Sequence, residues 1–126
     1  NLSPDEVDYV NAHGTSTVEG DAIEIDSLRQ LFHARAEEVP VSATKSMHGH
    51  LMGAAGAIEA IATVLALRHD ALPPTLNLDT VDPACAGVRH IVGGPLRDSG
   101  AQVALSNSFA FGGSNAVLAF RKADAA

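Results

Sequence analysis

The sequence predicts an α/β fold in which helices cover a sheet. The prediction rests on short β-prone runs, on two longer segments with helical character, and on their order along the chain. Strand-like runs at 7–10 and 39–42 each lead through a loop into a helical segment, and three further strand-like segments follow residue 87. The resulting order, β-α-β-α-β-β-β, is typical of helices packed on a sheet.

The first helix is predicted over about residues 18–34. Thr15-Ser16-Thr17 precedes it with hydroxyls suited to N-capping, and Asp21 and Glu24 place negative charge near the positive end of the helix dipole. Apolar side chains recur at helical spacing at Ile25, Leu28, Leu31 and Phe32. The pattern indicates an amphipathic helix with one face on the core.

The second helix is predicted over about residues 54–69 and is apolar nearly all round. A helix of this kind is expected to be buried on most of its faces. Glu59 is the exception, and a carboxylate in such a helix needs a partner. A membrane span needs about 20 predominantly apolar residues, so the segment is interpreted as a core helix and no membrane contact is expected.

The C-terminal third is predicted to be mainly β. Residues 88–92 form a candidate short strand, and 102–107 and 115–121 a hairpin-like antiparallel pair. The connection 109–114 contains a glycine pair between polar and aromatic residues. It lacks the Gly-Lys-Ser/Thr ending of a phosphate-binding loop, so a tight turn beside an apolar cavity is the favoured interpretation.

Composition excludes several classes of protein. The chain has 126 residues, a formal net charge of −7 and only eight scattered Lys and Arg, which argues against nucleic-acid binding. A single Cys excludes an internal disulfide and fits a reducing cytoplasm. No signal peptide is visible. The chain begins without Met and leads directly into a strand-like run, as expected of a piece of a longer protein.

Two loops contain the candidate functional residues. Asn11-Ala12-His13-Gly14 follows the first strand, and Lys45-Ser46-Met47-His48-Gly49-His50 follows the second. Loops after strands are where open α/β sheets build their sites. Two histidines in equivalent positions allow three chemistries, and spacing alone leaves all three open.

In the first, His13 and a histidine of the second loop donate to one developing oxyanion. In the second, His13, His48 and His50 bind a metal, with Asp21 or Glu24 completing the set. In the third, a histidine activates a nucleophile. The only thiol, Cys85, lies in a loop without a helix start or base beside it, so a structural role is expected for it.

Five motifs in register resemble one family. The chain from about Val7 to Lys122 is similar to the C-terminal half of β-ketoacyl-acyl carrier protein synthases, the elongating ketosynthases of the thiolase superfamily. The motifs are Asn11-Ala12-His13-Gly14-Thr15-Ser16-Thr17, Thr44-Lys45-Ser46-Met47-His48-Gly49-His50, Gly53-Ala54-Ala55-Gly56, Leu72-Pro73-Pro74-Thr75-Leu76-Asn77 and Asn107-Ser108-Phe109-Ala110-Phe111-Gly112-Gly113.

The resemblance implies roles for individual residues. His13 and His50 match the catalytic histidines that stabilise the enolate left when a malonyl thioester loses CO₂. Lys45 matches an active-site lysine expected to position or tune the second histidine. Among the substrate-binding positions, Thr15 and Thr17 match hydroxyls that hold the phosphopantetheine arm. Phe109 and Phe111 match the aromatic pair beside the acyl pocket, and Phe111 matches the gating residue.

The resemblance also implies a fold and partners. Residues 1–126 would form one C-terminal domain, half of an αβαβα sandwich, with helices on a mixed five-stranded sheet. The parent would be an acyltransferase of fatty acid or polyketide biosynthesis, homodimeric and cytoplasmic, needing no metal or cofactor. It would act with an acyl carrier protein. The nucleophilic cysteine belongs to the family's N-terminal half, so this chain alone is predicted to be inactive in condensation.

Some features depart from the family or allow alternatives. Many relatives have Gly where this chain has Ala110, and Pro where it has Val18, which affects acyl-chain specificity. A non-catalytic chain-length-factor-like partner subunit is the alternative function, although retention of the two histidines and the lysine weighs against it. Five positions resemble those that surround a buried structural cation in some family members. A salt bridge of Glu59 or a hydrogen-bond cluster is an equal alternative there. The positions are Asn11, Glu24, Glu59, Ser106 and Asn115.

Overall fold

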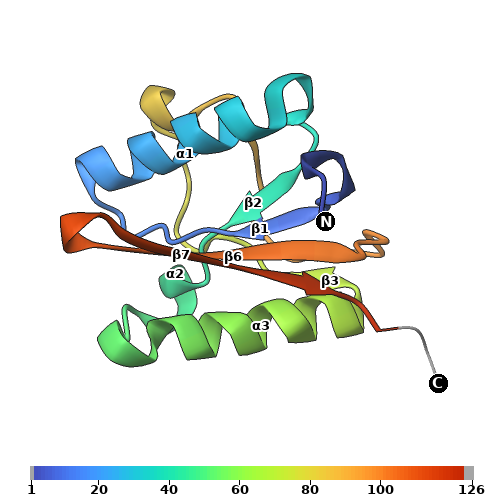
Figure 1. Cartoon of the computed structure of the whole chain (residues 1–126). Helices are drawn as coiled ribbons and strands as arrows, with labels where there is room; N and C mark the ends of the chain where they lie inside the picture. The colour runs from blue at the N-terminus through green and yellow to red at the C-terminus, as the bar shows by residue number, and fades with distance from the viewer. Residues whose placement is uncertain (1, 124–126) are drawn as a thin grey trace.

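The computed structural model describes residues 2–123 and is built on a five-stranded mixed sheet (Figure 1). Its strands run in the order β4-β2-β1-β6-β7, in which the first four are parallel and β7 is antiparallel to β6. The bounds are β4 Arg89–His90, β2 Pro40–Ser42, β1 Tyr9–Asn11, β6 Val103–Ala110 and β7 Ser114–Arg121. The predicted mixed five-stranded sheet is therefore confirmed.

Helix α1 (Val18–Phe32) covers one face of the sheet (Figure 1). The helical spacing seen in the sequence places Ile25, Leu28 and Phe32 inside, where they pack with apolar residues of β1, β2 and β6. Leu31, at the margin of the stripe, is 40% exposed. The short helix η2 (His33–Arg35) extends α1, so the predicted end near residue 34 is accurate to about one turn.

Helix α3 (Ala55–His69) covers the opposite face (Figure 1). Its Ala- and Leu-rich sequence favours the helical backbone, and Ala66 and Leu67 pack with Tyr9, Leu72 and Ala104 in a second core cluster. No helix in residues 2–123 is long and apolar enough to cross a lipid bilayer. The sheet is thus sandwiched between two helices.

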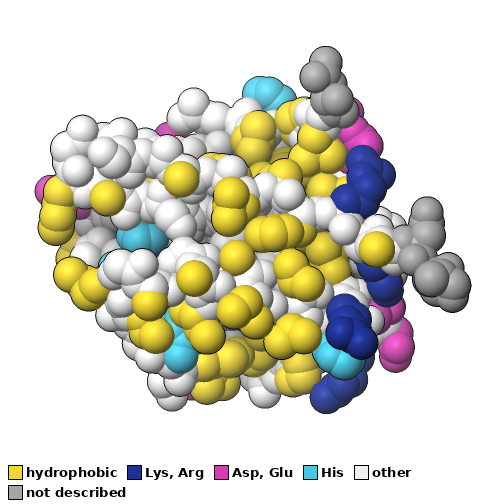
Figure 2. Space-filling model, turned by 60° about the horizontal axis from the view of Figure 1, so that its bottom comes forward, with side chains coloured by type: hydrophobic (Ala, Val, Ile, Leu, Met, Phe, Trp, Pro, Cys, Tyr) yellow, Lys and Arg dark blue, Asp and Glu magenta, His cyan; other side chains and the backbone are white. Residues whose placement is uncertain are grey.

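The expected burial of α3 on most faces is wrong for this chain. Ile61, Val64 and Leu65 are 56%, 44% and 44% exposed, because only the side of α3 that faces the sheet is covered. The edge strand β7 is also open, with Val117 and Leu118 51% and 50% exposed. Figure 2 shows hydrophobic side chains crowded on this face of the molecule. Leu118 lies on the same side of β7 as Phe120, which packs with α3, whereas Val117 points to the other side of the sheet. We call Ile61, Val64, Leu65 and Leu118 the open apolar face.

Several small elements were not predicted. An antiparallel ribbon pairs β3 (Ala71–Leu72) with β5 (Leu96–Arg97). The second histidine loop contains a single helical turn, α2 (Lys45–His48). The other short 3-10 turns are η1 (Pro4–Glu6), η3 (Met52–Ala54), η4 (Pro83–Cys85), which lies beside α1, and η5 (Phe111–Gly113), which joins β6 to β7.

Candidate active site

The two histidine loops leave the same end of the sheet. Strands β1 and β2 are parallel neighbours with Asn11 opposite Ser42, so the segments that follow them emerge side by side. His13 comes two residues after β1, and Lys45 three residues after β2. Parallel pairing therefore brings together residues more than 30 positions apart in the sequence.

Gly14 lets the two loops touch. A Cβ atom at this position would lie 2.5 Å from the Cβ of Ala43 in the second loop, and the Gly14 φ of +43° is in the region that favours glycine. A larger residue would separate the loops or distort the backbone beside His13. The glycine of the first motif thus has a specific steric role.

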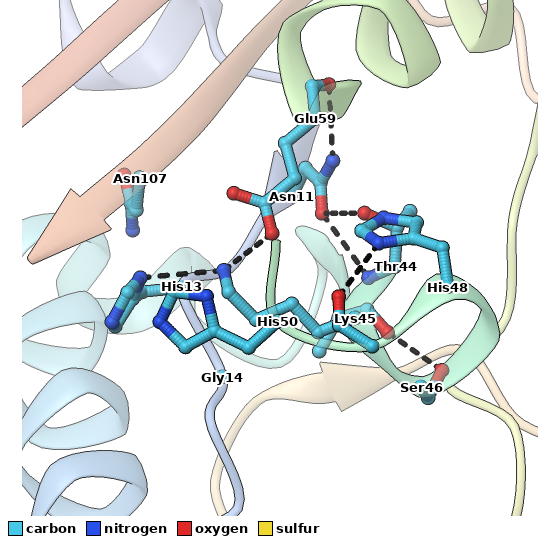
Figure 3. Close-up of polar contacts among 12 residues, drawn as sticks. Asn11, His13, Gly14, Thr44, Lys45, Ser46, His48, His50, Glu59 and Asn107 are labelled. Carbon is cyan, nitrogen blue, oxygen red and sulfur yellow. Dashed lines mark hydrogen bonds and ion pairs between the residues drawn. The ribbon is translucent and has the colours of Figure 1, made fainter. Parts of the chain in front are cut away.

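The rings of His13 and His50 converge (Figure 3). Their centroids are 5.6 Å apart and their planes meet at 88°, an edge-to-face arrangement. Phe109 packs against the same His13 ring, with the centroids 5.7 Å apart. Phe111, in contrast, is fully exposed on η5. Of the two predicted aromatic residues, only Phe109 contacts a histidine in this structure.

Lys45 links the first histidine to the buried Glu59. Its ammonium Nζ lies 3.3 Å from Nδ1 of His13 and donates to Oε1 of Glu59 (Figure 3). Both members of the ion pair are almost completely buried. The direct contact of Lys45 is with His13, and its role in positioning or electrostatically tuning the second histidine stays a prediction.

Both imidazoles are held in the same tautomer. An ammonium group has no lone pair, so His13 Nδ1 accepts from Lys45 and a neutral His13 carries its proton on Nε2. His50 Nδ1 accepts from the backbone N–H of Met52 at 3.1 Å, which leaves Nε2–H on that ring as well. Each ring therefore has an N–H at Nε2 that makes no hydrogen bond within residues 2–123.

The environment of His13 favours the neutral ring. Burial lowers the pKa of His13 below its ordinary value of 6.5, and the nearby positive charge of Lys45 lowers it further. The carboxylates of Glu24 and Glu59 act in the opposite direction but do not overcome these effects. His13 is thus a neutral hydrogen-bond donor near physiological pH.

Glu24 clamps the loop that carries His13. Its two carboxylate oxygens accept from the backbone N–H groups of His13 and Gly14, both at 2.9 Å, and Oε1 also accepts from the side-chain amide of Asn107 at 2.9 Å. One turn earlier in α1, Asp21 accepts from the N–H of Ser16 at 3.1 Å. Sequence reasoning placed these carboxylates near the helix start but missed the clamp.

Asn107 was also missed as a site residue. It is 4% exposed near the end of β6, and its side-chain amide ties that strand to the Glu24 clamp. A buried amide needs a hydrogen-bond partner, so the polar run Ser106-Asn107-Ser108 between apolar residues of β6 was the signal available in the sequence.

A second polar network joins β1 to α3. Asn11 donates to the Glu59 carbonyl and to the Thr63 hydroxyl at 3.3 and 3.1 Å, and it accepts from the Thr44 hydroxyl at 3.1 Å. Glu59 itself pairs with Lys45, although its Oε2 is buried without a partner among the described residues.

Hydrogen bonds and an ion pair engage the two carboxylates named in the alternatives that involve a cation. Glu59 is engaged by Lys45, and both oxygens of Glu24 accept from N–H groups, which matches the salt-bridge and hydrogen-bond alternative. Within residues 2–123, no group of three or more His, Cys, Asp or Glu is gathered as a metal ion would require. The three histidines proposed as metal ligands, His13, His48 and His50, are therefore not gathered into such a group in the described structure.

The predicted hydroxyl positions border an open cleft. A cleft of about 720 Å³ is lined by residues of both loops, including Thr15, Thr17, Lys45 and His50. The Thr15 and Thr17 hydroxyls lie 3.3 Å apart. Thr17 is the N-cap residue of α1 but its hydroxyl makes no capping bond, so the predicted side-chain cap is absent.

Cys85 also lines this cleft and is partly buried against the α1 core. Burial raises the pKa of its thiol, and the nearby carboxylates of Asp21 and Asp82 act in the same direction. A thiol with these properties is a weak nucleophile, in agreement with the structural role expected for Cys85.

Residues 1–79 match the family model described as β-ketoacyl synthase, C-terminal domain. The chain belongs to this family. It is 50% identical over 121 residues to 3-oxoacyl-acyl-carrier-protein synthase 2 of Synechocystis sp., an alignment that covers 96% of the chain and 29% of that relative. The identification made from the five motifs is therefore confirmed.

Solved structures agree with the fold. A β-ketoacyl synthase from Burkholderia phymatum matches with a TM-score of 0.90 and 43% identity, over 97% of this chain and 29% of that one. A ketosynthase of a type II polyketide system, solved in complex with its acyl-carrier protein and bound to the hexaketide, matches with a TM-score of 0.92 and 33% identity over 98% of this chain and 30% of that one. The thiolase-like fold is thus confirmed. The chain spans about 30% of the length of the proteins it matches.

Proposed function

We propose that this chain provides the two histidine donors of a β-ketoacyl synthase that performs decarboxylative Claisen condensation. The observation that carries the proposal is the convergence of His13 and His50, with centroids 5.6 Å apart and Nδ1 occupied on both rings. Two Nε2–H donors from separate loops suit a single oxygen that gains negative charge.

The donors act on the malonyl thioester. The bond between its α-carbon and its carboxylate breaks, CO₂ leaves, and the electron pair forms an enolate whose negative charge develops on the thioester oxygen. His13 and His50 donate to that oxygen through Nε2. A preorganised donor of this kind stabilises the transition state by about 3–4 kcal/mol.

Condensation then requires a residue outside this chain. The enolate carbon attacks the carbonyl carbon of an acyl group bound to the synthase's cysteine, a new carbon–carbon bond forms, and the cysteine leaves as a thiolate. The resemblance places this cysteine in the N-terminal half of the parent. In this proposal, residues 1–126 form a single C-terminal domain. That domain is inactive in condensation without the other half of the synthase.

Lys45 and the flanking residues support the two donors. Lys45 holds the His13 tautomer, and Thr15 and Thr17 border the cleft where they would hold the phosphopantetheine arm of an acyl carrier protein. Phe109 packs on His13 and limits its movement, and Phe111 would turn toward the acyl chain as the gate. A solved relative in complex with its acyl-carrier protein supports this choice of partner.

The open apolar face is proposed to pack against the rest of the parent enzyme. Ile61, Val64 and Leu65 of α3 lie on the same side of the sheet as Leu118 of β7, and α3 contacts β7. About 70% of the length of the Synechocystis relative lies outside the region that this chain matches. The remaining half would bury α3 as the middle layer of the αβαβα sandwich. We further propose a homodimeric parent located in the cytoplasm, where a reduced Cys85 is stable.

The chain-length-factor alternative is less well supported. A subunit that lacks catalysis has no requirement for the two Nε2–H donors or for a buried lysine that holds one of them. All three residues are present and in contact. The geometry therefore favours the catalytic subunit.

The test uses the full-length synthase that carries this segment. His13→Ala and His50→Ala are each expected to slow release of labelled CO₂ from malonyl-acyl carrier protein about 10²–10³-fold. Transfer of an acyl group onto the cysteine is expected to continue. Unchanged CO₂ release by both variants would refute the proposal.

A further inference from the structure

His48 lies between Lys45 and His50 but has no role in the mechanism above. It is the last residue of α2 and is partly buried. Its Nδ1 lies 2.8 Å from the carbonyl oxygen of Gly49. Because a carbonyl only accepts, Nδ1 carries the proton and donates it to Gly49.

The other nitrogen of His48 is buried and has no partner among residues 2–123. With the proton on Nδ1, a neutral ring leaves Nε2 as a bare acceptor. The hydrogen bond to Gly49 therefore fixes which nitrogen of the neutral ring carries the proton.

The backbone of Gly49 is held at both of its polar groups. Its N–H donates to the Lys45 carbonyl at 2.8 Å, which ends α2, and its carbonyl accepts from His48. Its φ of +77° and ψ of 178° lie in a region that glycine occupies readily and other residues rarely do. Neither torsion is fixed by sterics at a glycine, so these two hydrogen bonds set the local conformation.

The carbonyl that His48 holds belongs to the peptide bond between Gly49 and His50. Rotation of that peptide plane moves the Cα of His50 and the direction of its ring. His50 is exposed, and its ring makes one hydrogen bond among the described residues, to the Met52 N–H. The His13 ring is also held by Lys45 and Phe109. The position of the Nε2 donor of His50 therefore depends on the backbone more than the position of the Nε2 donor of His13 does.

We infer that His48 is a positioning residue for His50, acting through the Gly49 carbonyl. The inference rests on the proposed function, because it concerns the placement of one of its two donors. A displacement of about 1 Å at a reacting centre can cost about 100-fold in rate. Loss of the His48 hydrogen bond should therefore reduce decarboxylation without changing the residues that contact the substrate.

The test compares His48→Asn with His48→Gln in the full-length synthase. The amide nitrogen of Asn can take the place of Nδ1, whereas the longer Gln side chain extends its amide toward the position of Nε2. We expect His48→Gln to lower kcat for CO₂ release from malonyl-acyl carrier protein about 10-fold or more, with KM and cysteine acylation unchanged. His48→Asn should keep kcat within about threefold of the parent, which is the rescue that a general structural role does not predict.

A double-variant cycle with His50→Ala separates positioning from stability. In a His50→Ala background, His48→Gln should cause no further loss of kcat, because the donor it positions is gone. Additive losses, equal kcat for Asn and Gln at position 48, or a lowered melting temperature with unchanged kcat would each overturn the inference. Unaltered CO₂ release by His50→Ala would instead refute the proposed function itself.

Discussion

The ammonium nitrogen of Lys45 lies 3.3 Å from Nδ1 of His13 while it pairs with the buried carboxylate of Glu59. One side chain from the second loop thus fixes the tautomer of a histidine in the first loop. The same contact adds positive charge beside that histidine and lowers its pKa. Lys45 therefore connects the buried network of α3 to the proposed chemistry.

The first prediction concerns the titration of His13. Burial, and then Lys45, depress the pKa of the ring below 6.5, so the unfolded chain binds more protons than the native state just below that pH. The contribution of His13 to stability should be complete above pH 6.5 and decrease as the pH falls through that window. Histidine NMR titration of the full-length synthase should give a His13 midpoint below 6.5, and a midpoint at or above 6.5 would contradict the prediction.

The second prediction concerns the Lys45–Glu59 pair. Lys45→Met should lower the free energy of unfolding by about 3–5 kcal/mol, because it leaves a buried carboxylate without its partner. The double variant Lys45→Met/Glu59→Gln removes both charges and should recover more than half of that loss. Urea unfolding of the full-length protein measures both values, and equal losses in the two variants would rule out the explanation.

The buried positions of the fold were predictable from the sequence where one segment of this chain packs on another segment of the same chain. The periodicity of α1 gave Ile25, Leu28 and Phe32 correctly as buried, and the order of the elements indicated helices packed on a sheet. The mixed five-stranded sheet came from the family resemblance. The burial of α3 was not predictable, because a helix that is apolar all round has the same sequence whether its outer face meets its own chain or another one. The two-residue strands β3 and β5 are too short to carry a period.

The site was predictable at the level of its loops. Two histidines after parallel strands indicated convergence, and their rings do lie 5.6 Å apart. The contact of Lys45 with His13 rather than with its loop neighbour His50 depends on a flexible side chain, which sequence spacing does not determine. The Glu24 clamp was hidden for a different reason, since its three donors come from residues 10, 11 and 83 positions away.

The third prediction concerns that clamp. Glu24→Gln replaces one acceptor oxygen with an amide that faces an N–H group, so it should cost about 1–3 kcal/mol of stability and slow CO₂ release. It should also lower the pKa of His13 further, since the Glu24 charge raises that pKa.

Glu19→Gln is the matched control for the clamp. Glu19 is exposed in the first turn of the same helix, so its variant should change stability by less than about 0.5 kcal/mol. Denaturant unfolding, CO₂ release and NMR titration of both variants provide the comparison. A Glu24→Gln enzyme with parental stability and rate would show that the clamp is dispensable.

The last prediction concerns the open apolar face. Ile61, Val64 and Leu65 are about half exposed on one side of α3, so the isolated chain should associate through this side as its concentration rises. Replacing all three with Ser should reduce association measured by sedimentation, whereas Ile23→Ser, at a site 65% exposed on α1, should not. In the full-length synthase the same substitutions should instead affect stability, because the rest of the enzyme then covers α3. The triple variant should lose several kcal/mol of stability at about 25 cal/mol per Å² of apolar area uncovered, while Ile23→Ser should change stability little. Equal effects of the two variants in the full-length protein would mean that α3 is not the buried middle layer.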